Sequence, residues 1–482
     1  MEKTTTPRIA IKMQYWLFRK QKSSIWLLII FLLAGIYGLY QGFVFKQKQR
    51  NTIETFREDR TKKFAKVIDS FSADTTKPEG KEALMAAKST REANWATNLP
   101  TFKTPVSTAI FCIGQADVFP YYYNVKIESF FMQLFKQGEI NNPLRSLAGH
   151  FDVSFWVIYL LPLLIIVLSF NALSAELDNG NWRLLNAQGI GARQWLSSKF
   201  LWVGILLEIL VLVVFLVGII VNFIYFQQAP SLSDLLFFIG INLYLIFWLS
   251  VVYLINSFGR NTSNNALFSG IAWTIICIIM PTLFSMISES IVEVDNTVVS
   301  RMSRRPQGSK FEDETFGIKT IKQLGELNPK YKNAVINPKS RSFKFSIYTA
   351  YHELLDDTNK VAVRQYFDKI EQRQNITNGS TLLNPTAAMD GIFANLAQND
   401  AAANHQFVWQ TKAFHGKLHD AYFPVLFFNK SMQKADYERF PVFESNRNTS
   451  ITALLWLNYV VLLTLIGGLI GWANRRLAHL HF

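Results

Sequence analysis

Six apolar stretches constrain the fold of this 482-residue chain more than any other feature of its sequence. A helix needs about 20 apolar residues to cross a hydrocarbon core that is roughly 30 Å thick. The stretches of about that length are residues 24–45, 153–170, 200–226, 235–258, 266–287 and 451–472. The first is too long for the apolar core of a signal peptide and lacks a small-x-small cleavage site. The sequence therefore predicts a mainly α membrane protein with six transmembrane helices.

Lysine and arginine residues near the ends of these stretches predict the orientation, because short cytoplasmic loops are enriched in both. The N-terminal arm, residues 1–23, carries six of them against one acid, and the loop 171–199 and the tail 473–482 are also basic. The loop 227–234 contains neither residue type. We therefore expect the arm, the loop 171–199 and the tail in the cytoplasm, with both termini on that side.

Two long polar segments, residues 46–152 and 289–450, follow the first and the fifth apolar stretches. Because long segments cross a membrane regardless of their charge, we expect both to be extracytoplasmic inserts. Periodic apolar residues predict that the inserts are largely helical, and their attachment to one bundle predicts that they pack together. The helical parts are residues 52–71, 345–373, 382–396 and 402–428, the extended parts are 106–113 and 121–123, and residues 290–342 are partly loop.

Sequence motifs for catalysis are missing. The chain has no G-x-x-x-x-G-K-[ST] motif of a P-loop and no G-x-S-x-G motif of a serine hydrolase. His352-Glu353 begins like a zinc-protease helix, but Asp356 stands where the second histidine ligand belongs. His415 and His419 are four residues apart and could share a metal ion, although a polar helix face is the favoured interpretation because no third ligand is visible. We therefore expect a non-catalytic chain without a metal or cofactor of its own.

The N-terminal arm has a pattern that is typical of a helix lying at a membrane surface. Ile9, Met13, Trp16 and Leu17 recur at helical spacing beside a stripe of basic residues, which predicts an interfacial amphipathic helix. An ordinary basic flank is the alternative. The formal net charge of +14 also favours contact with anionic lipid headgroups over nucleic acid, since the polar segments lack a basic cluster with interleaved aromatic residues.

Glu208 is the ionisable residue that lies well inside an apolar stretch, residues 200–226. A carboxylate in a membrane interior is costly, so a functional role is the default expectation. Glu208 could face a polar path or pair with a neighbouring helix. The alternative is that it reaches the cytoplasmic interface, because Lys199 is only about two and a half helical turns away.

A polar island, residues 174–199, separates the second and third apolar stretches and has the pattern of a broken helix. Gly180 can end one helical piece, and Asn181 can cap the next. Residues 182–188 would then form about two turns before Gly189 breaks the chain again. A short helix held between two membrane helices on the cytoplasmic side would provide a contact surface through which a cytoplasmic protein could exert force.

This island resembles the cytoplasmic loop of ABC type-2 exporter permeases. In that loop an acid is followed by a glycine, by Arg-Leu-Leu, by a break and by basic residues that lead into the next span. The matching residues are Glu176, Gly180, Arg183, Leu184, Leu185, Gln188, Gly189, Arg193 and Lys199. A second likeness, to the subset of these permeases with large extracytoplasmic regions after the first and fifth spans, rests on Leu383-Asn384-Pro385, residues 392–396, Asn399-Asp400, His405 and Phe407.

The resemblance implies a permease subunit of an ATP-binding-cassette transporter in a bacterial cytoplasmic (inner) membrane. Its partners would be a dimer of ATPase subunits that bind ATP and Mg²⁺, a second permease copy or a paralogue, and membrane lipids. The island would be the coupling helix, in which Trp182, Leu184 and Leu185 provide an apolar contact with the ATPase and Arg183 provides a polar one. The residues implied in coupling are Glu176, Gly180, Trp182, Arg183, Leu184, Leu185, Gln188, Gly189 and Arg193.

Two functions remain open at this stage. In the first, ATP hydrolysis by the separate ATPase drives export of an unidentified, lipid-like, peptide or other amphiphilic substrate. In the second, the complex is a mechanotransmitter, in which hydrolysis moves the outer segments to act on an extracytoplasmic protein and nothing crosses the membrane. The large share of the chain in the two polar segments keeps the second function open.

Overall fold

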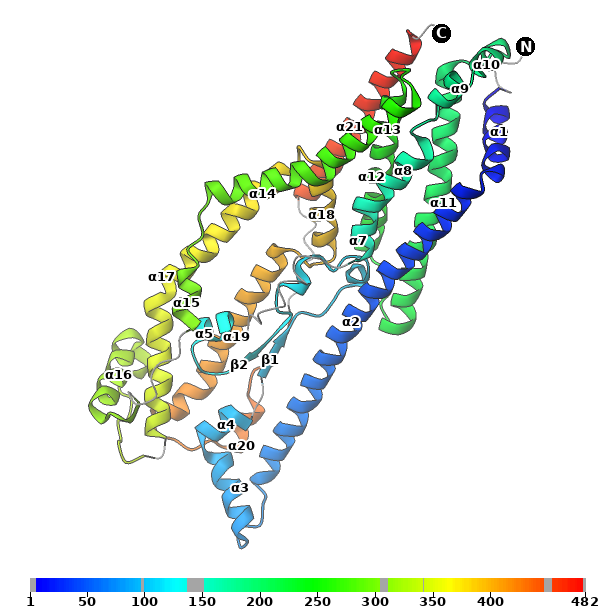
Figure 1. The fold of residues 1–482 in the computed structure, drawn as a ribbon. Coiled ribbons are helices and arrows are strands. Elements are labelled where there is room, and N and C mark those ends of the chain that lie inside the picture. The colour runs from blue at the N-terminus through cyan, green and yellow to red at the C-terminus, as the bar shows by residue number, and fades with distance from the viewer. Residues whose placement is uncertain are drawn as a thin grey trace.

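A computed structural model describes residues 6–96, 99–136, 151–303, 311–340, 342–445 and 453–479. The described chain is mainly helical, and six of its helices are long and apolar enough to cross a membrane. These six helices, which we call the bundle, gather at one end of an elongated molecule, and most other elements form a head at the opposite end (Figure 1). The prediction of a mainly α chain with six helices of this kind is confirmed.

Each predicted stretch overlaps one bundle helix, and the first of these helices extends well beyond its stretch. The bundle consists of α2 (Lys22–Ser70), α7 to α9 (Val153–Asp178), α11 (Ala192–Phe226), α12 (Leu232–Asn256), α13 to α14 (Thr262–Ile291) and α21 (Ala453–Ala478). The second is divided into α7 (Val153–Phe155), the π-helical turn η3 (Trp156–Leu160), α8 (Leu161–Ser169) and α9 (Ser174–Asp178). The fifth is divided into α13 (Thr262–Thr274), the π-helical turn η4 (Ile275–Ile279) and α14 (Met280–Ile291).

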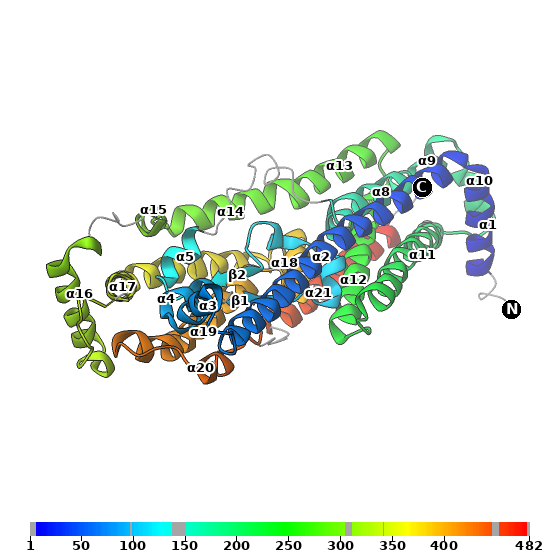
Figure 2. The same cartoon turned by 90° about the horizontal axis from the view of Figure 1, so that it is seen from below.

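The helix α2 links the bundle to the head without interruption. It has 49 residues, which corresponds to a length of about 73 Å at 1.5 Å per residue. The sequence pattern predicts its apolar part and residues 52–71 as separate elements, but no glycine or proline lies between positions 46 and 70 to end the helix. In Figure 1 α2 runs along one side of the molecule, and in Figure 2 it crosses the face that is seen from below.

The head has its own hydrophobic cluster, to which both polar segments contribute buried residues. A two-stranded antiparallel sheet lies within it, with Leu99 of β1 paired with Val125 of β2. The elements of the first polar segment are α3 (Pro78–Lys88), α4 (Thr90–Ala96), β1 (Leu99–Phe102), η1 (Ser107–Ile110), η2 (Gly114–Asp117), β2 (Tyr122–Val125) and α5 (Phe130–Lys136). Those of the second are α15 (Thr297–Ser303), α16 (Glu314–Leu327), η6 (Pro329–Tyr331), α17 (Phe343–Ser380), α18 (Pro385–Leu396), α19 (Ala401–Phe427) and α20 (Lys434–Glu438).

The structure changes two local predictions for the polar segments. Residues 106–113 were predicted to be extended, but they contain the 3₁₀ turn η1, whose four residues are all buried. The region 290–342 is more helical than expected, since it contains α15 and α16. The start of α16 is capped by Asp313, whose side chain accepts a hydrogen bond from the backbone N–H of Phe316.

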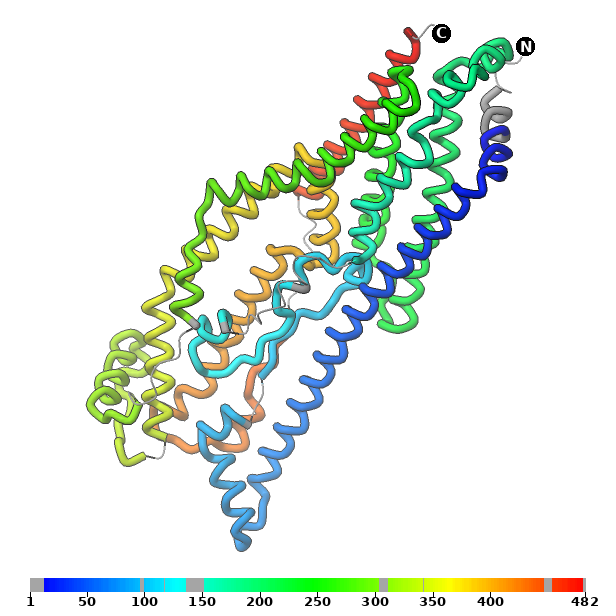
Figure 3. The backbone as a smooth tube through the Cα atoms, in the orientation of Figure 1, coloured from blue at the N-terminus to red at the C-terminus, as the bar shows by residue number. Residues whose placement is uncertain are grey.

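Two segments from the polar half are inserted into the end of the bundle that faces the head, here called the head end. Phe111, directly after η1, is fully buried and stacks on Phe215 of α11, with ring centroids 5.1 Å apart. Phe393 of α18 stacks on Phe237 of α12 at 4.2 Å. The backbone trace shows both segments reaching from the head to the bundle (Figure 3). The head and the bundle therefore share a packed boundary rather than a flexible linker.

Candidate functional site

The opposite end of the bundle, here called the loop end, carries the short helix α10 (Trp182–Ala187) between α9 and α11. Two glycines produce the breaks that the sequence predicts, since Gly180 has φ of 72° and Gly189 has φ of 75°. Side chains other than glycine rarely adopt this left-handed conformation. Asn181 precedes α10 as predicted, but its side chain does not cap the helix. Its amide instead donates a hydrogen bond to Glu176 at 3.3 Å.

The side chains of α10 divide between the bundle and the surface. Trp182 and Leu185 are only 7% and 4% exposed and belong to the hydrophobic cluster of the bundle. Leu184 is 64% exposed, and Arg183 is exposed beside it. The predicted apolar contact through Trp182, Leu184 and Leu185 is therefore revised, because Trp182 and Leu185 anchor α10 in the bundle. A partner at this surface would meet Leu184 and Arg183.

The other residues implied in coupling lie on both sides of α10 along the chain. Gly180, Gln188, Gly189 and Arg193 are exposed, and Glu176 is half-buried. Gly180, Gln188 and Gly189 flank α10 directly, whereas Glu176 belongs to α9 and Arg193 to the first turn of α11. The sequence therefore predicted the breaks and the exposed polar positions of this loop, but it did not distinguish the inward face of α10 from the outward face.

Hydrogen bonds tie the loop to two neighbouring helices. The indole N–H of Trp195 in α11 donates to the carbonyl of Ala172 at 3.0 Å. The hydroxyl of Thr262, at the start of α13, donates to the carboxylate of Asp178 in α9 at 2.6 Å. Together with the buried side chains of α10, these contacts connect the loop to the second, third and fifth bundle helices. A displacement of α10 would therefore move several helices together.

A cavity of about 590 Å³ lies between α11, α12 and α21. Most of its lining is apolar, and Glu208 of α11 and Asn242 of α12 both line it, close enough for their side chains to interact. Arg193 and Tyr253 also line it, and the Tyr253 hydroxyl donates to Asn474 of α21 at 3.0 Å. Glu208 therefore faces a groove beside a polar side chain of a neighbouring helix, and its role in coupling stays a prediction.

The N-terminal arm forms the helix α1 (Thr6–Lys20) beside α11. Met13 packs partly against the hydrophobic cluster of the bundle, whereas Trp16 and Leu17 are 53% and 36% exposed. The side chain of Ile9 lies outside the described part. The four predicted apolar residues therefore do not all pack on the bundle, and the exposed Trp16 and Leu17 beside Arg19 are typical of a helix at a membrane surface.

A buried group of hydrogen bonds, here called a joint, lies at the head end where α2 leaves the bundle, and no sequence pattern predicts it. Lys46 is 1% exposed, and its ammonium group donates hydrogen bonds of 2.6 Å to both Asn222 and Gln228. The side-chain amide of Asn222 donates in turn to the carbonyl of Ser107 in η1 at 3.0 Å. Lys46 therefore connects α2, the end of α11 and η1. A lysine after an apolar stretch looks like an ordinary flank, so no sequence pattern indicates this role.

A second joint connects α18 to the two π-helical turns, which often occur at functional positions of helices. The hydroxyl of Tyr244 in α12 donates to the carbonyl of Ile158 in η3 at 3.0 Å and lies 3.1 Å from the hydroxyl of Thr386 in α18. Thr386 donates to the sulfur of Cys277 in η4 at 3.5 Å. A head element and three bundle helices therefore meet in one buried polar group.

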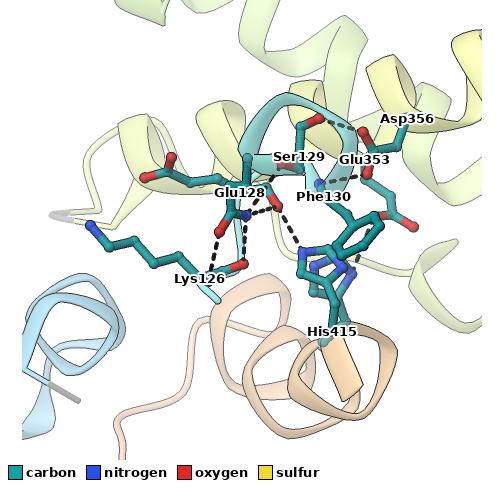
Figure 4. Close-up of polar contacts among 9 residues, drawn as sticks. Lys126, Glu128, Ser129, Phe130, Glu353, Asp356 and His415 are labelled. Carbon is teal, nitrogen blue, oxygen red and sulfur yellow. Dashed lines mark hydrogen bonds and ion pairs between the residues drawn. The ribbon is translucent and has the colours of Figure 1, made fainter. Parts of the chain in front are cut away.

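The histidines that could have bound a metal lie in the head, where they join a buried polar cluster (Figure 4). His419 Nδ1 lies 3.1 Å from the carboxylate of Glu353, and His415 Nε2 lies 2.7 Å from the carbonyl of Glu128. Asp356 accepts hydrogen bonds from the hydroxyl of Ser129 and from the backbone N–H of Phe130. Within the described ranges, no three His, Cys, Asp or Glu side chains are placed to hold a metal ion.

Burial and mutual charge shift the pKa values in this cluster. Burial raises the pKa of Asp356 to about 6, although its hydrogen bonds from Ser129 oppose the shift. Burial also acts to raise the pKa of Glu353, but the hydrogen bond from His419 and its charge outweigh it, so this pKa lies below its ordinary value. Burial, with a smaller effect from His419, places the pKa of His415 well below its ordinary value. The cluster ties α17 and α19 to the β2–α5 connection and is best explained as part of the head core.

Comparison with known protein families gives a match in the second polar segment. A family model described as a domain of unknown function (DUF3526) matches residues 304–446. This range is less than half of the chain and contains the head elements from α16 to α20, including α18 and the two helices of the buried polar cluster. No curated protein matches the sequence.

Proposed function

We propose that this chain is the membrane-spanning permease subunit of an ATP-binding-cassette exporter. The observation that carries the proposal is the helix α10, which is anchored in the bundle by Trp182 and Leu185 and turns Arg183 and Leu184 outward. A short helix of this kind can receive a force at its surface and pass it to the helices in which it is rooted. The chain has no P-loop motif, so in this proposal a pair of separate ATPase subunits binds ATP and Mg²⁺.

The proposed orientation places the loop end in the cytoplasm and the head outside. The ends of the described chain support this orientation, because α1 and α21 both carry basic residues in their last turns at the loop end. A cysteine placed at Lys81 in α3 should react with a membrane-impermeant thiol reagent in intact cells. A cysteine at Asn181 should react only after the membrane is opened, and labelling of that site in sealed cells would contradict the orientation.

Export of an amphiphilic substrate is the output that the geometry supports best. The cavity beside α11 has a volume of about 590 Å³ and a mainly apolar lining with a few polar groups, Glu208 and Asn242 among them. These are the usual properties of a small-ligand site. Because α11 begins three residues after the turn at Gly189, movement of α10 would reach the wall of this cavity directly.

Movement of the head is the second candidate output, and the helix α2 favours it. A continuous helix of 49 residues joins the bundle to the head, and its joint at Lys46 also includes η1 and the end of α11. A change in the tilt of α11 would therefore shift the head as well. In this alternative the complex also contains a second permease copy, and the moving heads act on an extracytoplasmic protein.

The attachment of an ATPase is tested by a single substitution at the exposed leucine. Leu184→Asp should abolish co-purification of the ATPase, because it puts a charge into the proposed apolar contact, while the bundle stays folded. Leu383→Asp is the matched control, since Leu383 is 67% exposed against 64% for Leu184 and lies outside the loop. Equal recovery of the ATPase with Leu184→Asp and with Leu383→Asp would refute the proposed contact.

The two outputs are separated in sealed vesicles that contain the purified complex. For export, ATP should move a fluorescent phospholipid between the leaflets, and Gly204→Phe, which fills the cavity, should stop this movement without releasing the ATPase. For head movement alone, the phospholipid should stay in place while ATP changes the distance between spin labels at positions 81 and 181. Glu208→Gln should lower ATP hydrolysis if the charge of Glu208 takes part in coupling, and it should have no effect otherwise.

A further inference from the structure

A second cavity lies in the head, on the side of α2 that faces the sheet. Its volume is about 680 Å³, and its walls come from α2, from β1 and from the extended residues 442–443 that follow α20. Phe64 and Ile68 of α2, with Phe102 and Val442 opposite, make its lining largely apolar. In Figure 1 this part of α2 runs beside β1, far from the loop end. The cavity is therefore separate from the groove beside α11.

Two arginines of α2 stand at this cavity. Arg57 and Arg60 are three residues apart, so they lie on the same face of the helix. The guanidinium group of Arg57 lies over the ring of Phe102, 4.8 Å from its centroid, and that of Arg60 lies over the ring of Phe64 at 5.1 Å. The aromatic rings hold both groups in place while leaving N–H donors free for a ligand.

Neither arginine is neutralised by a carboxylate within the described ranges of the chain. Of the nearby acids of α2, Glu54 forms an ion pair with Arg50 at 2.8 Å and Glu58 forms one with Lys62 at 3.6 Å, whereas Asp59 forms no ion pair with either arginine in the described structure. Arg60 donates to the carbonyl of Pro441 at 3.5 Å, which leaves its charge uncompensated. Two positive charges therefore stand beside an apolar hollow.

We propose that this head cavity binds a small anionic amphiphile, with its carboxylate or phosphate group held by Arg57 and Arg60 and its apolar body against Phe64, Ile68 and Phe102. Arginine pairs carboxylate and phosphate through parallel hydrogen bonds, which suits both headgroups. A volume of about 680 Å³ lies within the usual range for small-ligand sites. A protein partner would need about 800 Å² of contact surface on this chain, which a hollow of this kind does not offer by itself.

Binding of a dansyl-labelled undecanoate to the full-length protein in lipid nanodiscs tests the proposal. Empty nanodiscs give the background from the lipid. Replacing both arginines, Arg57→Gln with Arg60→Gln, should weaken binding about tenfold or more, because the charge-assisted hydrogen bonds to the headgroup are lost. Ala65→Trp should also weaken binding, since Ala65 lines the cavity and the larger ring fills it.

Lys63→Gln with Lys66→Gln is the matched control, because it removes the same charge from exposed positions on another face of α2. This control should bind the probe like the unmodified protein, and the unfolding temperatures of all variants should agree. Dodecanoate or dodecyl phosphate should displace the probe, and the more effective of the two identifies the headgroup. Equal displacement by dodecyltrimethylammonium, equal loss in the lysine control or unchanged binding without the two arginines would each overturn the proposal.

Discussion

The head end of the bundle is filled by side chains from the polar segments, whereas the loop end turns side chains toward a surface that the described residues leave uncovered. Phe111 and Phe393 are fully buried between bundle helices. At the other end, Leu184 is 64% exposed although its neighbour Leu185 is 4% exposed. One end is thus packed against another part of the same chain, and the other end holds a rigid helix that is only half covered.

This difference indicates how force could pass through the molecule. An interface with interdigitated aromatic side chains transmits displacement because its packing leaves few voids. An exposed helix with an anchored base can accept a partner without unfolding. We therefore expect substitutions at the head end to change the stability of the fold, and substitutions at the outward face of α10 to change partner binding while stability is kept.

The largest expected effect on stability is at Phe393. Phe393→Ala removes a ring that stacks on Phe237 and is fully buried, which should lower the free energy of unfolding by about 3–5 kcal/mol. Thermal unfolding in detergent measures the change. Leu383→Ala, at an exposed position just before α18, is the control and should change stability by less than about 0.5 kcal/mol. A small effect at Phe393 would contradict the packed boundary.

A glycine in α2 gives the next largest effect. A Cβ atom at Gly42 would overlap the backbone carbonyl of Ile110, the last residue of η1. Gly42→Ala should therefore separate η1 from α2 and destabilise the fold by about 3 kcal/mol. Gly467→Ala in α21 meets open space among the described residues and should leave the unfolding temperature unchanged or raise it slightly. Similar behaviour of the two variants would show that η1 does not pack on α2 as described.

Lys46→Met should have an intermediate effect. It keeps the length of the side chain but removes the donor that serves Asn222 and Gln228. When buried acceptors lose a charged donor, the free energy of unfolding decreases by about 2 kcal/mol. Lys48→Met, two residues along α2 at an exposed position, is the control. Equal unfolding temperatures of the two variants would show that the Lys46 joint does not contribute to stability.

The smallest effect concerns the pH dependence of the head. Burial lowers the pKa of His352 to about 4, below its value in an unfolded chain. The unfolded state therefore binds the proton first, so the contribution of His352 is present above about pH 6.5 and is lost as the pH falls toward 4. When the pH falls from 7 to 5, the free energy of unfolding of the unmodified protein should decrease. In His352→Leu this decrease should be smaller by about 1–2 kcal/mol.

Asp356 works in the opposite direction, because its pKa is raised to about 6. Its contribution is present at low pH and is lost as the pH rises from about 4 to 6. Unfolding temperatures measured at several pH values distinguish the two groups, because the contribution of His352 is lost as the pH falls and that of Asp356 is lost as the pH rises. An unchanged pH profile in His352→Leu would show that this histidine does not have the lowered pKa.

Sequence patterns were sufficient for the elements that depend on local chemistry. The apolar stretches predicted the six bundle helices because crossing a membrane sets their length, and Gly180 and Gly189 predicted the ends of α9 and α10 because their backbone conformation favours glycine. The inward face of α10 could not be predicted, since Leu184 and Leu185 are chemically identical and only the surrounding helices distinguish them. The same holds for contacts between distant residues, such as Lys46 with Asn222 and Glu353 with His419.

The central claim, that the outward face of α10 contacts a separate ATPase, is tested most directly by photo-crosslinking in intact cells. A photoreactive phenylalanine analogue at Leu184 should form a crosslink to a protein whose sequence, identified by mass spectrometry, contains a P-loop motif. The same analogue at Leu383, which is equally exposed, should form no such crosslink. A crosslink from Leu184 to membrane lipid alone, or to the P-loop protein from both positions alike, would contradict the account.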